Sequence, residues 1–312
     1  MRVFVAGATG AIGRVLVPRL VAAGHDVVGT TRSEVKAAAL RALGAAPVVC
    51  DVLDASAVTR AAVDARPDVV VNELTDLPRA QESPKLRYFF DENDRVQREG
   101  TKNLLGAARA AGARRYVAQS IAYFYAPAGD ALRTEDDPLY VDAPPPVGEA
   151  VRAQKDAEDL ALSAPEIAAV LLRYGVFYGP GTWYAKDGDI GRRVRDRKYP
   201  IVGTGNGHYS FIHVDDAAAA TALFVERGAP GVYNVVDDDP APANAWMPAY
   251  AAALGAPAPM RLPAWIARLP EEKAQMTWAT ELRGAANGKA KNEVGWTPKY
   301  ASWRRGFVEA CG

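Results

Sequence analysis

Short apolar runs alternate with longer amphipathic stretches over the first half of the chain. The apolar runs cover residues 2–6, 25–30, 47–50, 67–72, 115–120 and 167–173. Between them, helical spacing of apolar positions marks residues 11–23, 34–43, 55–65, 84–112 and 148–163. Strict alternation of buried strands and helices is typical of parallel βαβ units. The pattern therefore predicts an α/β fold built on a doubly wound parallel sheet.

The regular alternation stops after Arg173. Residues 175–207 are rich in Gly, Tyr and Trp and have little periodicity, whereas residues 211–225 return to a strand followed by a helix. From residue 240 onward, prolines and tryptophans separate short helical segments. We therefore expect two domains. One comprises residues 1–175 and 209–235, and a smaller, discontinuous C-terminal domain comprises residues 176–208 and 236–312.

Composition and charge narrow the class of protein. The 37 basic and 37 acidic side chains cancel, so no overall field would attract nucleic acid or an anionic membrane. Two cysteines are too few for a disulfide framework, and the three histidines are widely spaced and match no zinc motif. No signal peptide opens the sequence, and no apolar run approaches the ~20 residues of a membrane-spanning helix. We expect a cytoplasmic enzyme or binding protein without a metal.

A glycine-rich turn follows the first apolar run, between a predicted strand and a predicted helix. In dinucleotide-binding Rossmann domains, three glycines at this point allow a tight turn, close approach of a pyrophosphate, and close packing of helix on strand. The helix N-terminus adds N–H donors and partial positive charge. The residues predicted to bind a dinucleotide here are Gly7, Thr9, Gly10, Ala11, Ile12 and Gly13.

The ends of the second and third strands bear on the adenosine half of the dinucleotide. An NAD site places an acidic residue after the second strand, but residues 28–33 are Val-Gly-Thr-Thr-Arg-Ser. Arg32 can pair with a 2′-phosphate, which favours NADP over NAD; the alternative is an exposed arginine that opens a helix. After the third strand, Asp51 could accept from the adenine amino group beside Val52, or it could cap the next helix.

Six motifs in a fixed order resemble the extended short-chain dehydrogenase/reductases, which form the NAD(P)-dependent epimerase/dehydratase group. The motifs are Gly7-x-x-Gly10-x-x-Gly13, Asp51-Val52, Gly100-Thr101-x-Asn103-Leu104-Leu105, Ser120, Leu172-Arg173-Tyr174-Gly175-x-x-Tyr178-Gly179-Pro180-Gly181 and Phe211-Ile212-His213-Val214-Asp215-Asp216. The resemblance covers about residues 1–236. It implies a Rossmann domain that binds a nicotinamide dinucleotide and a smaller domain that binds substrate.

The resemblance also implies a catalytic Ser and a Tyr-x-x-x-Lys pair, and here the chain departs from the family. Ser120 would orient the substrate oxygen, and Lys155 would hold the nicotinamide ribose; for Lys155 the alternative is a solvated lysine on the helix surface. Val151 stands at the position expected for the tyrosine, and Gln97 stands where an asparagine usually supports a water relay. Because valine carries no proton, the proton carrier is lost, relocated or unnecessary.

The predicted catalytic residues are Ser120, Lys155 and Tyr123. Tyr123 lies three positions past Ser120, at the carboxyl end of the fifth strand, where ligands bind in open α/β sheets. It is therefore the first candidate for a relocated acid, and Tyr125 and Tyr140 are further phenols on the same edge.

Residues after the fourth and sixth strands complete the predicted site. By analogy with the family, the cofactor passes Asn72, Glu73 and Leu74, and then Tyr174 and Val176. Glu73 is unusual at this position and could be a proton-relay acid, a salt-bridge partner or a solvated side chain. The residues predicted to line the substrate pocket are Tyr178, Trp183 and Tyr184; for Trp183, packing in the core is the alternative.

Three functions remain open from the sequence. The first is an NADP-dependent oxidoreductase that acts on a small organic substrate by hydride transfer. The second is an epimerase, dehydratase or cyclase without net redox change, and the third is an NADP-binding sensor without turnover.

A homodimer is also expected, because residues 84–112 and 148–163 correspond to the family's four-helix interface. Its possible contact positions are Leu86, Phe89, Phe90 and Leu104.

Overall fold

A parallel sheet forms the centre of the molecule. The computed structural model of the chain describes residues 1–77, 86–129, 132–266 and 280–311. Seven strands pair in the order β3-β2-β1-β4-β5-β6-β11, and all neighbours are parallel. The strands are β1 (Arg2–Ala6), β2 (Asp26–Thr31), β3 (Ala46–Val49), β4 (Val69–Asn72), β5 (Arg115–Ile121), β6 (Ala168–Tyr174) and β11 (Gly231–Val235). The doubly wound α/β fold expected from the sequence is confirmed.

Helices cover both faces of the sheet because its central strands are apolar on both sides. On one face, α1 (Gly13–Ala22) packs against α8 (Val214–Glu226), and their core includes Leu16 and Phe224. On the other, α3 (Ala55–Ala65), α5 (Thr101–Ala110) and α6 (Val147–Leu162) lie side by side over Tyr116 and Leu171. The remaining helices of this part are α2 (Glu34–Ala42), α4 (Leu86–Arg95) and α11 (Gly288–Val294).

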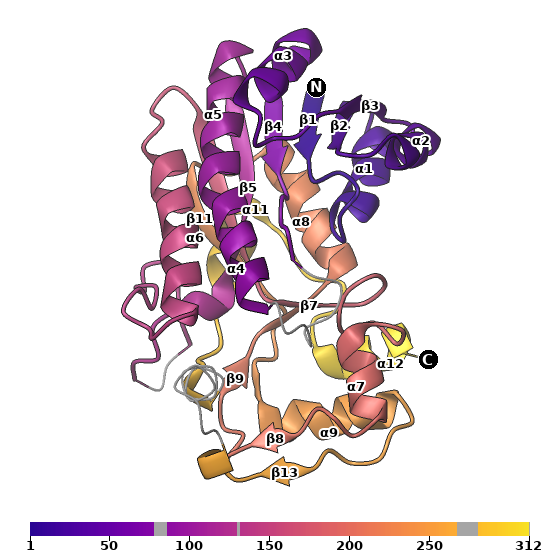
Figure 1. Cartoon of the computed structure of the whole chain (residues 1–312), viewed down its shortest axis with the longest axis vertical. Coiled ribbons are helices and arrows are strands. Elements are labelled where there is room, and N and C mark those ends of the chain that lie inside the picture. The colour runs from indigo at the N-terminus through magenta and orange to yellow at the C-terminus, as the bar shows by residue number, and fades with distance from the viewer. Residues whose placement is uncertain (78–85, 130–131, 267–279, 312) are drawn as a thin grey trace.

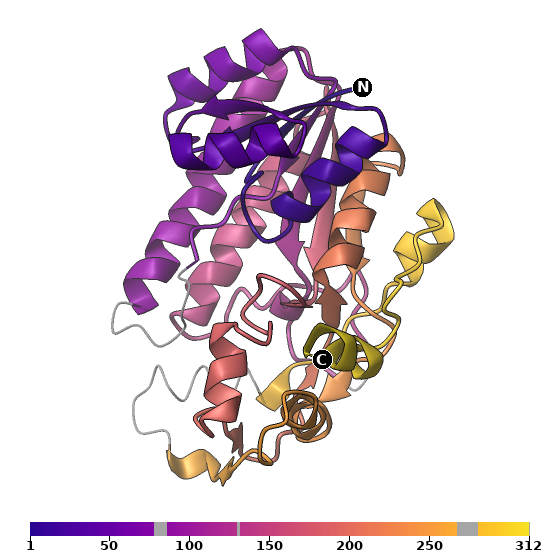
Figure 2. The same ribbon diagram turned by 90° about the vertical axis from the view of Figure 1, so that its right-hand side faces the viewer.

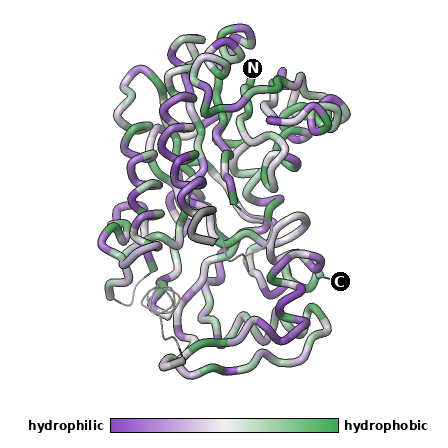
Figure 3. Tube along the Cα trace, viewed as in Figure 1, coloured by the Kyte–Doolittle hydropathy of each residue, from purple (hydrophilic) through white to green (hydrophobic). Residues whose placement is uncertain are grey.

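The long polar stretch expected to be one helix is divided. α4 and α5 are joined by a turn of π-helix at Val96–Gly100, where one extra residue enters the helical repeat. α4 lies against α6 on the outside of the molecule, and Figure 3 shows many hydrophilic positions along these helices. Of the positions expected in a dimer interface, Leu104 is buried within the protein itself, which removes it from any contact between copies. The side chains at 86–90 lie outside the described residues.

A second lobe lies beyond the carboxyl ends of the strands. It contains α7 (Asp189–Arg195), α9 (Ala243–Ala253) and α12 (Trp303–Cys311), and Figures 1 and 2 show it below the sheet. Its short strands are β7 (Val176–Tyr178), β8 (Ile201–Val202), β9 (His208–Tyr209), β10 (Phe211–His213), β12 (Ala241–Pro242) and β13 (Arg261–Leu262). β10 pairs with β7 rather than with the large sheet, so Phe211 belongs to this lobe.

Aromatic side chains from distant parts of the chain form the core of this second lobe. The ring of Tyr178 lies 5.1 Å from that of Phe307, edge to face, and Phe211 lies 5.2 Å from Trp246 in the same manner. Gly306 is required at this contact, because a Cβ there would lie 1.9 Å from the Tyr178 hydroxyl oxygen. α12 therefore completes the core of the second lobe by packing on β7, the strand that follows β6.

Candidate active site

The glycine loop presses directly against the end of β4. Gly7 has φ +83°, and a Cβ on it would lie 2.4 Å from the backbone oxygen of Glu73. A Cβ on Gly13 would lie 2.3 Å from the oxygen of Gly7, while the Gly10 amide donates to that same oxygen at 2.9 Å. Only glycine fits at positions 7 and 13, and the loop is therefore a cradle of bare backbone at the start of α1. The cradle fits the pyrophosphate of a dinucleotide.

The remaining loop residues lie between the cradle and the helix. Thr9 and Ala11 are partly exposed, whereas Ile12 is buried in the core beneath the loop. Ile12 occupies the N-cap position of α1 and has no side chain that could accept from the first-turn N–H groups. An anion at this end of the helix would therefore meet backbone donors and the positive end of the helix dipole.

The predicted adenosine contacts occupy neighbouring strand ends. Arg32 follows β2 and lies 3.2 Å from an Asp76 carboxylate oxygen, in an ion pair that is largely exposed. Asp51 is exposed and accepts from the Leu53 amide at 3.0 Å. Val52 is buried, and its oxygen accepts from Asn103 at 2.9 Å. Arg32 is thus placed where a phosphate would compete with Asp76 for its guanidinium.

A buried polar cluster lies below the carboxyl end of β4. The Tyr174 hydroxyl donates to Glu73 Oε1 at 3.0 Å, and Thr221 of α8 joins both side chains. Burial raises the pKa of Glu73 to about 8, although the hydrogen bonds from Tyr174 and Thr221 lower it. The carboxyl is therefore mainly protonated at neutral pH, and Tyr174 points its hydroxyl into the interior.

Asn72 and Leu74 flank Glu73 with different partners. The Asn72 amide donates to the Tyr116 hydroxyl at 2.9 Å, and its Oδ1 accepts from the Leu74 amide at 3.1 Å. Asn72 is therefore buried and held by the protein itself. The Leu74 oxygen accepts from Gln97 at 3.1 Å and from Gln119 at 3.2 Å.

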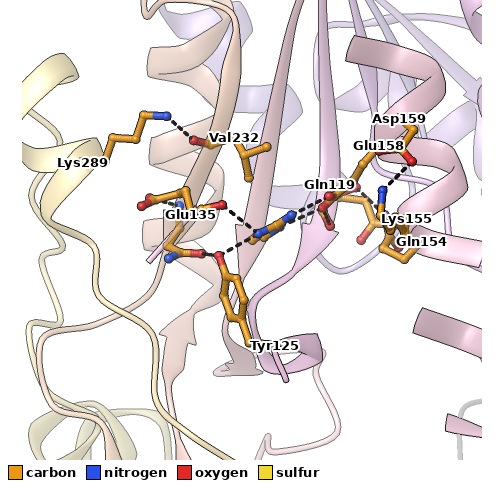
Figure 4. A network of polar contacts seen from close by, with 12 residues as sticks. Gln119, Tyr125, Glu135, Gln154, Lys155, Glu158, Asp159, Val232 and Lys289 are labelled. Atoms are coloured by element: carbon orange, nitrogen blue, oxygen red, sulfur yellow. Dashed lines mark hydrogen bonds and ion pairs between the residues drawn. The ribbon is translucent and has the colours of Figure 1, made fainter. Parts of the chain in front are cut away.

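Ser120 belongs to a buried ion-pair network. Its hydroxyl donates to Glu158 Oε1 at 2.5 Å, and Glu158 receives two hydrogen bonds from Arg173, at 2.9 and 2.6 Å. Arg173 also donates to the Tyr125 hydroxyl, which in turn donates to Asn234 at 2.7 Å. Figure 4 shows Tyr125 and Glu158 within this network. These bonds occupy the Ser120 hydroxyl and the Tyr125 phenol within the protein.

The structure does not bring Lys155 together with Ser120. The Lys155 side chain is 44% exposed, and its ammonium lies 2.5 Å from the carboxylate of Asp159, one turn later on α6. The neighbouring Gln154 is buried instead, and its Nε2 donates to the Gln119 oxygen at 3.4 Å. Val151 is also fully buried. The buried side of α6 thus carries Val151 and Gln154, and the ammonium of Lys155 lies where the helix is partly exposed.

Three glutamines line the region between β4, β5 and α6. Gln119 Nε2 donates to Gln97 Oε1 at 3.2 Å, and both amides reach the Leu74 oxygen. Gln154 continues the row at the Gln119 backbone. Sequence reasoning identified Gln97 but missed Gln119 and Gln154. The available signal was spacing, because Gln154 stands four residues before Glu158 and shares its helix face.

The candidate acid and the predicted substrate residues lie farther along this edge. Tyr123 is partly exposed, packs edge to face on Phe124, and has a pKa raised to about 12 by desolvation. Tyr178 and Tyr184 are buried in the second lobe, where Trp183 and Val176 pack against the same core. Tyr178 and Tyr184 are therefore core residues of the second lobe, and Trp183 packs against that core.

Comparison with known proteins agrees with this arrangement. The model of the NAD dependent epimerase/dehydratase family matches residues 3–235. A 3-diazoavenalumate denitrifying reductase from Streptomyces sp. is 47% identical over 308 residues, covering 98% of this chain and 99% of that protein. A 2-alkyl-3-oxoalkanoate reductase from Stenotrophomonas maltophilia is 27% identical over 266 residues, covering 82% and 77%.

A solved structure extends the likeness to the whole fold. Human epimerase family protein SDR39U1 (isoform 2) with NADPH superposes with a TM-score of 0.77 at 21% identity, covering 100% of this chain and 99% of that one. Among the described residues, no helix combines the length and apolar character needed to cross a membrane. The glycine cradle, the seven-stranded sheet and the family match lead to one conclusion. The chain belongs to the NAD-dependent epimerase/dehydratase family of extended short-chain dehydrogenase/reductases and is an oxidoreductase of that class.

Proposed function

We propose that this protein is an NADPH-dependent reductase that replaces the diazo group of a small carboxylic acid with hydrogen and releases dinitrogen. The observation that carries the proposal is the α6 face at the reaction centre. Val151 is buried at the position where the family carries its tyrosine, and Gln154 donates to the Gln119 backbone oxygen of β5; neither side chain can transfer a proton or carry a positive charge at neutral pH. The relative that is 47% identical over nearly the whole chain is named for a reaction of this class.

Replacement of a diazonium group by hydrogen does not need a general acid on α6, whereas reduction of a carbonyl does. Reduction of a carbonyl needs a proton on the oxygen, and a positioned general acid contributes about 10²–10⁴ to that rate. Replacing a diazonium group does not need a proton at the reacting carbon. A C–H bond forms with the electron pair of the hydride, the C–N bond breaks, and its electron pair leaves with dinitrogen. Loss of the tyrosine therefore costs this reaction nothing.

The residues present fit a nicotinamide dinucleotide. The loop at Gly7, Gly10 and Gly13 would hold the pyrophosphate on the N-terminus of α1. Arg32 would hold the 2′-phosphate, which supports NADP over NAD. When bound in its reduced form, the cofactor supplies the hydride.

Isotope labelling tests the proposed function. The protein would be incubated with C4-deuterated NADPH and an arenediazonium carboxylate that carries labelled nitrogen. We expect labelled dinitrogen gas, an equal amount of oxidised cofactor, and deuterium on the carbon that carried the diazonium group. Gly7→Ala, which fills the pyrophosphate cradle, serves as the inactive control. Cofactor oxidation without dinitrogen, or no oxidation above this control, would exclude the reaction.

Carbonyl reduction is the second candidate, because the 27% identical relative is named as a reductase of an oxoalkanoate. It requires an acid, and Tyr123 is the phenol that stands at the carboxyl end of β5. Tyr123→Phe separates the two reactions. It should lower carbonyl reduction by about 10²–10⁴ and leave release of dinitrogen within about threefold of the wild type.

The proposal includes a cytoplasmic homodimer. The helices α4 and α6 lie together on the outer surface, as expected for a shared four-helix interface. Cys50 and Cys311 are free thiols, as is usual in a reducing compartment.

A further inference from the structure

Arg14 places a positive charge in the first turn of α1, where a helix favours negative charge. That turn contains no acidic side chain. The Arg14 side chain is exposed, and its Nε donates to the Gly10 oxygen at 3.3 Å. In the part of the chain that the structure describes, no carboxylate lies within ion-pair distance of its guanidinium. An anion from outside the protein would therefore satisfy both the helix end and the arginine.

The other arginine of this helix has the partner that Arg14 lacks. Arg19 lies 3.6 Å from a carboxylate oxygen of Asp215 on α8, and the two side chains are 42% and 36% exposed. Its charge is therefore balanced within the protein and joins two helices. Because the two arginines share a helix and are both exposed, Arg19 is a matched reference for Arg14.

A turn of the second lobe rests on the Arg14 guanidinium. The turn follows β7 and contains Gly179 and Gly181, whose φ angles are +100° and +79°. A Cβ on Gly181 would lie 2.1 Å from Arg14 Nη2. On the other side of the turn, a Cβ on Gly179 would lie 2.5 Å from His213 Nε2. Figures 1 and 2 show this segment below the start of α1, so the guanidinium forms a contact between the glycine loop and the second lobe.

The position of the guanidinium indicates the chemistry of the anion. Gly10 belongs to the glycine cradle, and its oxygen holds Arg14 Nε, so the arginine lies beside the place that fits a pyrophosphate. The remaining guanidinium N–H groups suit phosphate oxygens, which an arginine can bind in pairs. Gly10, Arg14 and Gly181 are all exposed, so a ligand reaches the guanidinium without displacing a buried side chain. A diphosphate on the cradle would supply the missing negative charge.

We propose that Arg14 binds the pyrophosphate of the dinucleotide and, through its contact with Gly181, couples cofactor binding to the position of the second lobe. This inference rests on the proposed use of a nicotinamide dinucleotide. It assigns the phosphates to different arginines, because Arg32 would meet the 2′-phosphate and Arg14 the pyrophosphate. NADPH and NADH share only the pyrophosphate, so the two contacts can be measured separately.

A cofactor titration without substrate tests the pyrophosphate contact. Binding of NADPH and of NADH would be followed by the fluorescence of each dinucleotide for the wild type, Arg14→Met, Arg19→Met and Arg32→Ala. Arg14→Met should weaken binding of both dinucleotides by the same factor, about tenfold or more, as expected for one charged hydrogen bond. Arg32→Ala should weaken binding of NADPH alone, and Arg19→Met should leave both affinities within about twofold of the wild type.

Each alternative result of this titration has a separate meaning. Unchanged affinity of Arg14→Met for both dinucleotides would refute the contact, while cofactor binding by the wild type would leave the proposed function standing. A loss confined to NADPH would place the guanidinium at the 2′-phosphate and would also refute the contact. A wild type that binds neither dinucleotide would overturn the proposed function and this inference with it.

Gly181→Ala tests the link to the second lobe and leaves Arg14 itself in place. The new Cβ would displace the guanidinium, so both dinucleotides should bind about three- to tenfold more weakly. In the Arg14→Met background the same substitution should change affinity by less than about twofold, because the group that it displaces is absent. Gly255→Ala is the control for backbone strain, since Gly255 has φ +65° and a Cβ there would meet nothing within 4 Å. No loss from Gly181→Ala, or equal losses in the two backgrounds, would refute the coupling.

Discussion

Arg173 is a position at which a single substitution should cost much of the protein's stability. Its guanidinium makes two hydrogen bonds to Glu158, at 2.9 and 2.6 Å, and the two side chains are only 7% and 4% exposed. Arg173→Met would leave the Glu158 carboxylate buried with Ser120 as a remaining donor. Removing one partner of a buried ion pair typically costs about 3–5 kcal/mol, so we expect a loss of that size in the free energy of unfolding.

Urea unfolding with a second pair as control measures this loss. The Lys155–Asp159 pair is also a salt bridge, between neighbouring turns of α6, but its side chains are 44% and 61% exposed, so Lys155→Met should cost at most about 1 kcal/mol. The double variant Arg173→Met/Glu158→Met removes both buried charges and should recover most of the stability lost in Arg173→Met. A cost below about 1 kcal/mol for Arg173→Met, or a double variant less stable than the single one, would refute this account of the network.

Four further predictions concern the cofactor site and the assembly. Gly7→Ala should abolish NADPH binding in a fluorescence titration, since its Cβ would lie 2.4 Å from the Glu73 oxygen. Glu73 binds a proton in the folded protein up to a pKa of about 8 but loses it near 4.5 when unfolded, so wild-type stability should fall as pH rises between these values. Glu73→Gln should make that decline smaller in denaturation curves recorded across this range, and Asp237, whose pKa burial also raises to about 8, should account for a remaining decline. Asp76→Asn should free Arg32 and raise NADPH affinity several-fold without changing NADH affinity. Arg32→Ala should lower NADPH affinity about tenfold or more. Equal affinities of the wild-type protein for NADPH and NADH would argue against NADP as the cofactor. Light scattering should give the mass of a dimer, and a monomer would contradict the interface at α4 and α6.

Local patterns were sufficient to predict the fold. The apolar runs at β1, β4 and β6 are buried on both faces, and the glycine spacing after β1 has a single steric explanation, so both could be identified without tertiary information. The π-helical turn at Val96–Gly100 could not, because its sequence keeps ordinary helical character and the extra residue is accommodated by packing against α6.

The site was harder to predict because it depends on which way single side chains face. Lys155 and Gln154 are adjacent in sequence, and a rotation of about 100° decides which of them enters the protein. Ser120 has the residue type of a catalytic hydroxyl, yet Glu158 of α6 accepts its hydrogen bond, and Arg173 of β6 holds Glu158 in place. These residues are far apart in the sequence and meet only in the folded protein, so residue spacing along the chain could not predict the hydrogen bond.

The closure of the second lobe by α12 has a consequence for the order in which the protein forms during synthesis. Tyr178 leaves the ribosome long before Phe307, and Gly306 provides the space into which its ring fits. Until α12 has emerged, the aromatic side chains around Tyr178 lack the helix that covers them. Among the described elements, α12 packs mainly on α9 and β10, whereas the sheet is covered on one face by α8 and α11. The sheet can therefore assemble before α12 emerges, once α8 and α11 have been made, and the second lobe is completed only by the last helix.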